Sequence, residues 1–364
     1  MFSLHSISVY QFKNYLRQSW TFSERVVGIS GRNGTGKTNL LDAIYFLCFT
    51  KSYFQRSDAQ LVFHGALGMR VAGEFTKQAQ SFEISGLIRE NGKKEFQVNG
   101  SPCERMADHI GNFPAVMIAP DDVGIITEGS EERRRFLDAL FSQLDHQYLL
   151  QLMQYNRVLQ QRNSLLKQMA ETGKRSLDLL EVLDHQLCAP AEYVFTKRKE
   201  FLNLLIESVR DRYHNIAGQQ YDLQLRYESP LLLSPFAQLL AQNRERDLQS
   251  QRTQLGIHRD DLVISLGDKA FRQTASQGQR KSLLFALKLA EFAMLKSAKG
   301  FTPILLLDDV FEKLDETRMQ NLLQEVCVQN EGQVFVTDTH PNRIRDSFTA
   351  LGLPYQAVNS GTQA

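Results

Sequence analysis

The order of apolar and polar positions predicts strands and helices at both ends of the chain. Strand patterns at SISVYQF (residues 6–12) and VVGIS (residues 26–30) come first, and the second runs into a glycine-rich loop and then a helix from Thr38. Between residues 69 and 99, further segments alternate or are rich in β-formers, with Asn-Gly pairs at the turns. Because Asn-Gly is the preferred pair in tight hairpins, these segments predict an antiparallel β arm.

The pattern becomes helical between residues 130 and 213, where apolar residues recur at spacings of three and four. The segment 214–258 is less regular and carries two prolines, so we expect it to return the chain toward the first lobe. Patterns then resume for a hairpin at DLVISLGDKAF, a buried helix at SLLFALKLAEFAML and core parallel strands at TPILLLDDV and QVFVTDT. We therefore predict a discontinuous α/β lobe of residues 1–115 and 256–364, interrupted by a mainly helical lobe of residues 116–255.

The composition fits a two-lobed cytoplasmic protein. Of the 364 residues, 42% are hydrophobic, enough to bury a large core. The four cysteines lie far apart without CxxC spacing, which favours reduced thiols and argues against zinc. A basic start followed by an apolar run is lacking, as is any stretch of about 18 apolar residues, so neither export nor a membrane partner is expected. The net charge of +1 leaves the partner open, since a local basic face could still bind nucleic acid.

Residues 31–38 match the phosphate-binding pattern G-x-x-x-x-G-K-[ST], placed between a strand and a helix as that motif requires. The glycines let successive backbone N–H groups converge on phosphate oxygens, while the helix N-terminus adds a positive field. Lys37 would reach the β and γ phosphates, and Thr38 could ligate Mg²⁺. A chance glycine turn is the alternative, which the flanking elements disfavour. The expected nucleotide-binding residues are Gly31, Arg32, Asn33, Gly34, Thr35, Gly36, Lys37 and Thr38.

Two acids, Asp308 and Asp309, follow the apolar run ILLL. A phosphate loop needs a carboxylate for its metal, so we expect Asp308 to hold Mg²⁺ through water and Asp309 to face the attacking water as the catalytic base. An exposed strand end with acidic residues is the alternative, and the intact phosphate loop favours the metal site.

A second anion site is predicted before the buried helix, in TASQGQRK. A serine, a glycine and a helix N-terminus can together bind phosphate, which makes Ser276, Gly278 and Gln279 candidates, although an ordinary polar helix start has the same composition. The order of motifs along the chain favours the anion site. Phosphate loop, SQGQ helix, LLLDD strand, Leu314-Asp315 and VFVTDT strand follow one another as in ABC-type ATPases, in which an LSGGQ-like signature caps nucleotide held by the opposite subunit.

Three further segments are FKNY (residues 12–15), APDDVGIITEGSEERRRFLD (residues 119–138) and GIHRDDL (residues 256–262). They resemble the RecF family of bacterial recombination-mediator ATPases, itself similar to the heads of SMC-type chromosome proteins. The resemblance spans nearly the whole chain. It implies an α/β, ABC-type P-loop ATPase head with an antiparallel β arm, plus a mainly helical second lobe.

The resemblance also implies a nucleotide-gated clamp, a two-subunit ring that closes around DNA. ATP and Mg²⁺ would lie on Lys37, Thr38 and Asp308 of one subunit, while Ser276 and the Gly278 backbone of a second subunit would cap the γ-phosphate. The ATP-induced homodimer would bind double-stranded DNA, particularly gapped DNA, and work with RecO and RecR to help load RecA. ABC ATPases usually carry glutamate where this chain has the shorter Asp309, which fits the RecF family and indicates slow, DNA-stimulated turnover.

Other assignments stay open. The switch residue after the last core strand is Asp338 or His340, and the glutamine that couples nucleotide to the lobes is Gln55 or Gln60, unless these side chains are simply solvated.

Basic clusters at residues 133–135 and 197–199 could meet DNA phosphates, as could His258 and Arg259. Acids lie beside these residues, so solvated helix faces or ion-paired turns explain them as well.

Two other functions compete with the clamp. A transporter or another ABC-type or SMC-like motor subunit would place its signature much closer to the phosphate loop or carry a far longer helical insert, whereas Lys37 and Ser276 are 239 residues apart. A nucleotide-stabilised DNA-binding scaffold without significant turnover would not need an intact set of catalytic side chains.

Overall fold

The computed structural model describes residues 2–174, 176–218, 221–310 and 316–360. This part of the chain forms two compact units. The first comprises Met1–Val123, Asp211–Gln219 and Gln277–Ala364, and the second comprises Gly124–Arg210 and Gln220–Ser276. The lobe boundary expected at residue 256 falls inside the second unit, because the strand that follows it pairs within that unit's sheet. In the described part, no helix is both long and apolar enough to cross a membrane.

A five-stranded sheet forms the base of the first unit. Every neighbouring pair of its strands is parallel, and the central strands are buried along their whole length, as expected for a sheet covered on both faces. The core parallel strands predicted from TPILLLDDV and QVFVTDT are confirmed. The strand order is β14 (Gln356–Asn359), β3 (Val26–Ser30), β13 (Val334–Asp338), β12 (Ile304–Leu307) and β8 (Ala115–Ile118).

The predicted β arm is a six-stranded antiparallel sheet in the same unit. Gly92 and Gly100 of the two Asn-Gly turns both have φ of 75°, a conformation that glycine adopts without steric penalty. The first strand of the chain pairs with strands on both of its sides, which the alternation pattern could not indicate. The order is β2 (Tyr15–Thr21), β1 (Phe2–Phe12), β4 (Met69–Lys77), β5 (Gln80–Ile88), β6 (Lys94–Val98) and β7 (Ser101–Pro102).

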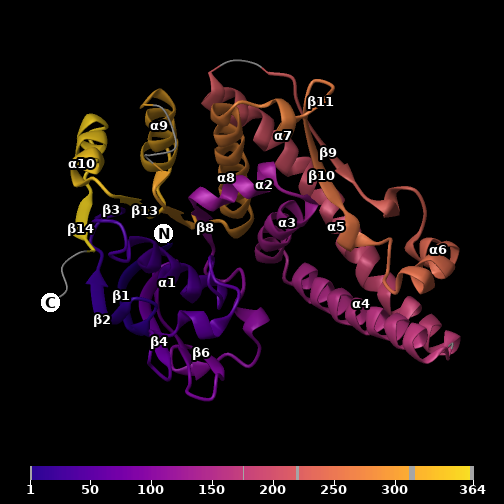
Figure 1. Ribbon diagram of the computed structural model, residues 1–364. Helices are drawn as coiled ribbons and strands as arrows, with labels where there is room; N and C mark the ends of the chain where they lie inside the picture. The colour runs from indigo at the N-terminus through magenta and orange to yellow at the C-terminus, as the bar shows by residue number, and fades with distance from the viewer. Residues whose placement is uncertain (1, 175, 219–220, 311–315, 361–364) are drawn as a thin grey trace. The chain divides into compact units, whose positions relative to one another are not determined.

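Helix α1 (Lys37–Phe49) packs between these two sheets, and 11 of its 13 residues are buried. Figure 1 shows three helices on the opposite face of the parallel sheet, namely α8 (Gln277–Lys299), α9 (Glu316–Leu323) and α10 (Pro341–Ala350). Shorter turns connect the elements: η1 (Asp58–Leu61), η2 (Met106–His109), η3 (Pro120–Val123) and the π-helical η7 (Gln324–Val328).

The second unit is mainly helical, as predicted. Its helices are α2 (Gly124–Thr127), α3 (Ser130–Leu144), α4 (His146–Thr172), α5 (Leu177–Ala217), α6 (Phe236–Ser250) and α7 (Phe271–Thr274), and its short turns are η4 (Pro230–Leu232) and η5 (Ile257–Arg259). A small antiparallel sheet has the order β11 (Lys269–Ala270), β10 (Asp261–Leu266) and β9 (Leu223–Glu228). The pairing of β10 with β11 confirms the hairpin predicted at DLVISLGDKAF.

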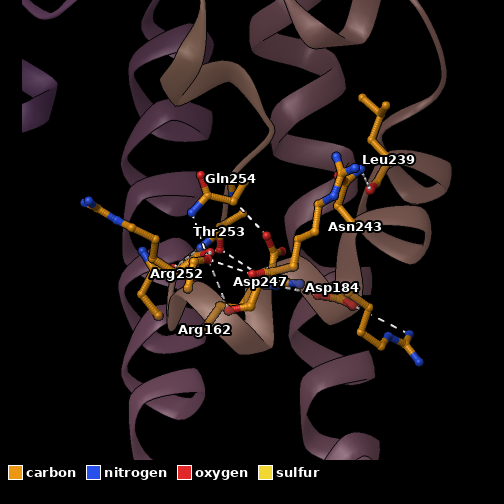
Figure 2. A network of polar contacts seen from close by, with 12 residues as sticks. Arg162, Asp184, Leu239, Asn243, Asp247, Arg252, Thr253 and Gln254 are labelled. Atoms are coloured by element: carbon orange, nitrogen blue, oxygen red, sulfur yellow. Dashed lines mark hydrogen bonds and ion pairs between the residues drawn. The ribbon is translucent and has the colours of Figure 1, made fainter. Parts of the chain in front are cut away.

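A fully buried arginine joins three helices of the second unit (Figure 2). The guanidinium of Arg162 on α4 donates to Asp184 of α5 at 2.5 Å and to Asp247 of α6 at 2.8 Å. It also donates to Thr253 Oγ1 at 2.8 Å, and the backbone N–H of Gln254 donates to Asp247 at 2.9 Å. Since two carboxylates share one cation in a buried site, losing the cation would leave uncompensated negative charge. The network therefore holds α4, α5 and α6 in register.

Candidate nucleotide-binding site

The predicted nucleotide residues meet at the carboxyl edge of the parallel sheet. The phosphate loop follows β3, whose last residue, Ser30, pairs in register with Asp338 at the end of β13. Asp308 directly follows β12, which is the next strand beside β13. Parallel strands present their carboxyl ends at one edge, and ligands bind there in open α/β sheets. The sheet thus brings together groups that are 270 residues apart in the chain.

Backbone conformation and close contacts explain the glycines of the loop. Gly34 and Gly36 have φ of 80° and 108°, in the left-handed region that favours glycine. A Cβ on Gly31 would lie 2.3 Å from the Ser360 hydroxyl and 2.7 Å from the Thr35 hydroxyl. Ser360 follows β14 near the end of the described chain, and no local sequence signal marks it as a support of this loop.

Lys37 begins α1 and lies under the loop. This residue is only 4% exposed, and its ammonium donates to the carbonyl oxygens of Gly31 at 2.9 Å and Arg32 at 3.3 Å. Arg32 and Asn33 are exposed on the outer side of the loop. The loop is therefore folded around a cation whose present acceptors are neutral carbonyls, which phosphate oxygens can replace with stronger, charge-assisted hydrogen bonds.

The FKNY segment supports the far end of the loop. The Tyr15 hydroxyl donates to the Gly36 carbonyl at 2.9 Å, and the Asn39 amide donates to Asn14 Oδ1 at 2.7 Å. The sequence analysis used FKNY only as a family signature and missed its contribution to the site. A conspicuous polar and aromatic pair next to a strand end was the available signal.

Oxygen ligands suitable for a metal ion converge beside the loop. The Thr38 hydroxyl donates to the Asp308 carboxylate, with its oxygen 2.9 and 3.1 Å from the two carboxylate oxygens. The Thr337 hydroxyl of β13 donates to Asp308 Oδ1 at 2.8 Å, a contact that sequence reasoning did not foresee. Burial raises the pKa of Asp308, while hydrogen bonds from Thr337 and Thr38 lower it. Hydroxyl and carboxylate oxygens are the ligands that Mg²⁺ prefers, so these residues fit that ion.

Asp309, the candidate base, has an unusual backbone. Its φ is 44°, a left-handed value that is uncommon outside glycine, and its N–H donates to Thr337 Oγ1 at 2.9 Å. Its side chain is half-buried. Residues held in sparsely populated conformations cluster at functional sites, because the surrounding structure must maintain them. The strand end therefore directs the two neighbouring acids differently.

The two candidate switch residues differ in their surroundings. Asp338 is 1% exposed and accepts hydrogen bonds from the His340 backbone N–H at 2.6 Å and from Arg343 of α10 at 3.2 Å. His340 itself is exposed. Asp338 thus anchors the start of α10, and the imidazole of His340 faces solvent.

The predicted signature begins helix α8. Ser276 immediately precedes the helix and is exposed, while Gly278 and Gln279 lie half-buried in the first turn. None of these three residues takes part in the hydrogen bonds described above that support the phosphate loop. Leu314-Asp315, expected between the strand LLLDD and the strand VFVTDT, lies outside the described residues.

Several candidate DNA ligands form ion pairs inside the second unit. Arg133 donates to both carboxylate oxygens of Asp261 at 2.7 and 2.9 Å, and Arg198 is 2% exposed with Asp260 at 2.6 Å and Asp138 at 2.8 Å. The acids of GIHRDDL therefore hold arginines of the other two predicted basic clusters. Sequence could not distinguish these buried pairs from solvated cations, because the partners lie 62 to 128 residues away.

Other members of these clusters lie at the surface with local acidic partners. Arg135 pairs with Glu131 and Glu132 on α3, and Lys197 pairs with Glu200 on α5. Lys199, Arg259, Gln55 and Gln60 are exposed.

His258 of the same segment is enclosed. Its Nδ1 lies 2.6 Å from the Tyr155 hydroxyl, and its Nε2 lies 3.1 Å from the Thr253 carbonyl. A carbonyl can only accept, so Nε2 carries the proton and Nδ1 accepts from Tyr155. Burial lowers the pKa of His258 to about 4. The residue is a neutral part of the interior at physiological pH.

A phosphate loop after β3, an acid after β12 and a helix-bound signature, on one parallel sheet backed by an antiparallel sheet, define an ABC-type ATPase head. The chain belongs to the RecF/RecN/SMC N-terminal domain family, which matches residues 3–359, and within it to the RecF proteins of DNA replication and repair.

Similarity to named relatives is extensive. The chain is 40% identical over 356 residues to the DNA replication and repair protein RecF of Flavobacterium johnsoniae, covering 98% of this chain and 99% of that protein. It is 38% identical to RecF of Cytophaga hutchinsonii, covering 93% and 90%. A structure of the recombination mediator protein RecF with ATP in the RecFOR pathway superposes with a TM-score of 0.88 at 31% identity, covering 99% and 96%. An Smc head domain from Pyrococcus furiosus, at TM-score 0.53 and 18% identity over 96% and 92%, shares the fold.

Proposed function

We propose that this chain binds ATP at the phosphate loop and closes as an ATP-induced homodimer on double-stranded DNA, particularly at gaps. The observation that carries the proposal is the direct hydrogen bonding between Thr38 of the loop and Asp308 at the distant strand end. It unites a phosphate cradle and a metal-binding acid in one site, as phosphoryl transfer requires.

The loop residues bind and orient the triphosphate. Backbone N–H groups and the N-terminus of α1 face the phosphates, and Lys37 exchanges its two carbonyl acceptors for β- and γ-phosphate oxygens. Thr38 and Asp308 would hold Mg²⁺, which supplies charge neutralisation for the phosphates when bound. Tyr15 and Thr337 keep the loop and the acid in position throughout.

The signature acts on nucleotide bound by a second copy of the chain. Ser276 is exposed and lies next to the positive N-terminus of a 23-residue helix, so it can cap a γ-phosphate presented from outside, together with Gly278 and Gln279. A two-fold axis would create two such sites at once. Hydrolysis removes the γ-phosphate and with it the contact across the interface, so ADP opens the clamp.

Asp309 accepts a proton from the attacking water, and His340 senses the γ-phosphate. The exposed imidazole is better placed for this than Asp338, whose carboxylate is occupied by Arg343. The aspartate reaches one methylene less far than the glutamate usual at this position, so turnover is slow. We expect Asp309→Asn to retain ATP and prolong DNA residence, measured by single-turnover hydrolysis and DNA dissociation. Faster DNA release than wild type would contradict the role as base.

The wider role is loading of RecA together with RecO and RecR during recombinational repair and replication restart. The relatives' description as DNA replication and repair proteins, and the RecFOR context of the similar ATP-bound structure, support this role.

Sedimentation velocity with ATP or ADP, each with gapped or fully duplex DNA, tests the proposal. We expect a dimer with ATP that gapped DNA stabilises further, and single chains with ADP. Single chains under saturating ATP and magnesium on DNA would overturn the proposal. Turnover measured with and without duplex DNA separates the clamp from a nucleotide-stabilised scaffold, which would show no hydrolysis above background.

A further inference from the structure

A cluster of charged side chains is buried in the first unit, away from the nucleotide contacts described above. Lys288 and Glu291 lie on α8, and Asp122 lies in η3, with exposed fractions of 4%, 5% and 8%. The Lys288 ammonium donates to the Tyr53 hydroxyl at 3.2 Å, and that hydroxyl donates to Asp122. Asp122 belongs to the APDDVG segment, for which the proposed ATPase chemistry gives no role.

The same cluster is bonded to the helix that carries the phosphate loop. Asp42 lies on α1, five residues after Lys37, and is fully buried. Its carboxylate accepts the backbone N–H of Tyr53 at 2.7 Å and the hydroxyl of Ser52 at 2.6 Å. Any movement of α1 therefore moves the backbone that carries the Tyr53 hydroxyl.

The other end of the cluster lies on the helix that begins with the signature. Lys288 is ten residues after Gly278, so about 15 Å of continuous helix separates them. Helix α8 is buried along most of its length, and a shift at Lys288 is carried rigidly to its first turn. A continuous set of bonded groups thus connects α1, through Tyr53, to α8.

Lys288 has two alternative anionic partners. Its ammonium lies 3.8 Å from Asp122 and 3.5 Å from Glu291, both longer than a charge-assisted hydrogen bond of about 2.7–2.9 Å. A shift of roughly 1 Å toward either carboxylate would shorten one contact and lengthen the other. Burial raises the pKa of Glu291 to about 7, as expected where one cation lies between two acids.

We propose that Tyr53, Asp122 and Lys288 form a positioning relay that transmits occupancy of the phosphate loop to the signature end of α8. When nucleotide binds, α1 adjusts, Asp42 carries Tyr53 with it, and the hydroxyl redistributes Lys288 between Asp122 and Glu291. The relay rests on the proposed function in one respect, namely that the signature caps nucleotide held by a second copy.

Tyr53→Phe tests the relay, since it removes the hydroxyl and keeps the ring. Tyr193→Phe is the matched control: Tyr193 is also half-buried and donates its hydroxyl to an aspartate, Asp145, at 3.0 Å in the second unit. We expect Tyr53→Phe to bind nucleotide as dilute monomer like the wild type, while the dissociation constant of the ATP-induced dimer rises about tenfold. Tyr193→Phe should match the wild type in both assays. Wild-type dimerisation by Tyr53→Phe would overturn the relay.

Hydrogen exchange separates failure of the relay from failure of the proposed dimer. In the Ser276→Arg background, designed to remain single, ATP should slow amide exchange in the first turns of α8, and adding Tyr53→Phe should abolish that response. This readout does not depend on whether wild-type chains associate. An unchanged ATP response in the presence of Tyr53→Phe, or no response without it, would overturn the relay.

A second substitution tests whether the groups act along one path. Lys288→Met with Glu291→Gln removes the cation together with one acid, so the buried charge balance is kept. It should weaken the dimer like Tyr53→Phe, and combining all three changes should add nothing further, because residues in one network are not additive. Fully additive effects would show separate causes and contradict the relay.

Discussion

Lys37 is already satisfied by the carbonyls of Gly31 and Arg32, so nucleotide must offer it better acceptors. Phosphate oxygens do so because a hydrogen bond between two charged groups is roughly twice as strong as one to a neutral group. Thr38 is likewise satisfied by Asp308. The loop is thereby kept folded by the same side chains that later hold the ligand, which limits the reorganisation on binding.

We predict that Lys37→Ala weakens ATP binding at least about 100-fold and abolishes ATP-dependent dimers, because the γ-phosphate loses its main cation. Titration with a fluorescent ATP analogue and gel filtration with ATP measure the two effects. Lys269→Ala, at an exposed position in the second unit, is the control. Dimerisation of Lys37→Ala at wild-type ATP concentrations would contradict the assignment.

His258 gives the second unit a specific dependence on pH. Its folded pKa of about 4 lies below the ordinary value of 6.5, so the unfolded chain binds the proton first as pH falls. Stability from this residue is therefore complete above about pH 6.5 and is lost between there and about pH 4, at a cost of up to about 3 kcal/mol. Urea unfolding should show this loss in the wild type. His258→Gln should flatten the dependence over the same interval, and an unchanged slope would contradict the buried neutral state.

At the scale of elements, the second unit relies on buried ion pairs where its helices meet. Arg162 is surrounded by Asp184, Asp247 and Thr253, so three helices share one cation (Figure 2). In a low-dielectric site such a group costs much desolvation, and its partners depend on it more than their contact energy suggests.

Arg162→Met should lower the free energy of unfolding by about 3–5 kcal/mol, because two carboxylates lose their buried cation. Arg246→Met, an exposed arginine of α6, should change it by less than about 0.5 kcal/mol. Urea denaturation followed by circular dichroism compares the two. Equal small effects would show that water compensates the acids.

At the scale of the whole molecule, the proposed clamp separates nucleotide binding from assembly. Lys37, Thr38 and Asp308 belong to one site within a single chain, whereas Ser276 is exposed and available to another copy. Binding and dimerisation should therefore respond to different substitutions.

Ser276→Arg is expected to leave nucleotide affinity of the dilute monomer nearly unchanged and to block ATP-dependent dimers, since a bulky side chain occupies the capping position. Equilibrium binding at low protein concentration and sedimentation at high concentration separate the two effects. Should nucleotide affinity of the monomer collapse, Ser276 would act within its own chain and the capping model would fail.

The nucleotide cradle was determined by the sequence itself. Gly31 to Thr38 are contiguous, and the requirements for left-handed glycines, a lysine and a helix start are all local, so the motif is legible without knowing the fold. The same holds for Asp308, because an apolar strand that ends in acids marks its own carboxyl edge. The hairpins at the Asn-Gly turns were predictable for the same reason.

Only the tertiary structure decided what lies opposite each residue. Ser360 and Thr337 support the site from strands distant in the chain, and Arg133 and Arg198 proved to be partners of buried acids that lie up to 128 residues away. Residues 256–276 joined the second unit because a strand there pairs with β9. Such contacts depend on which segments the fold brings together, and local composition carries no record of that choice.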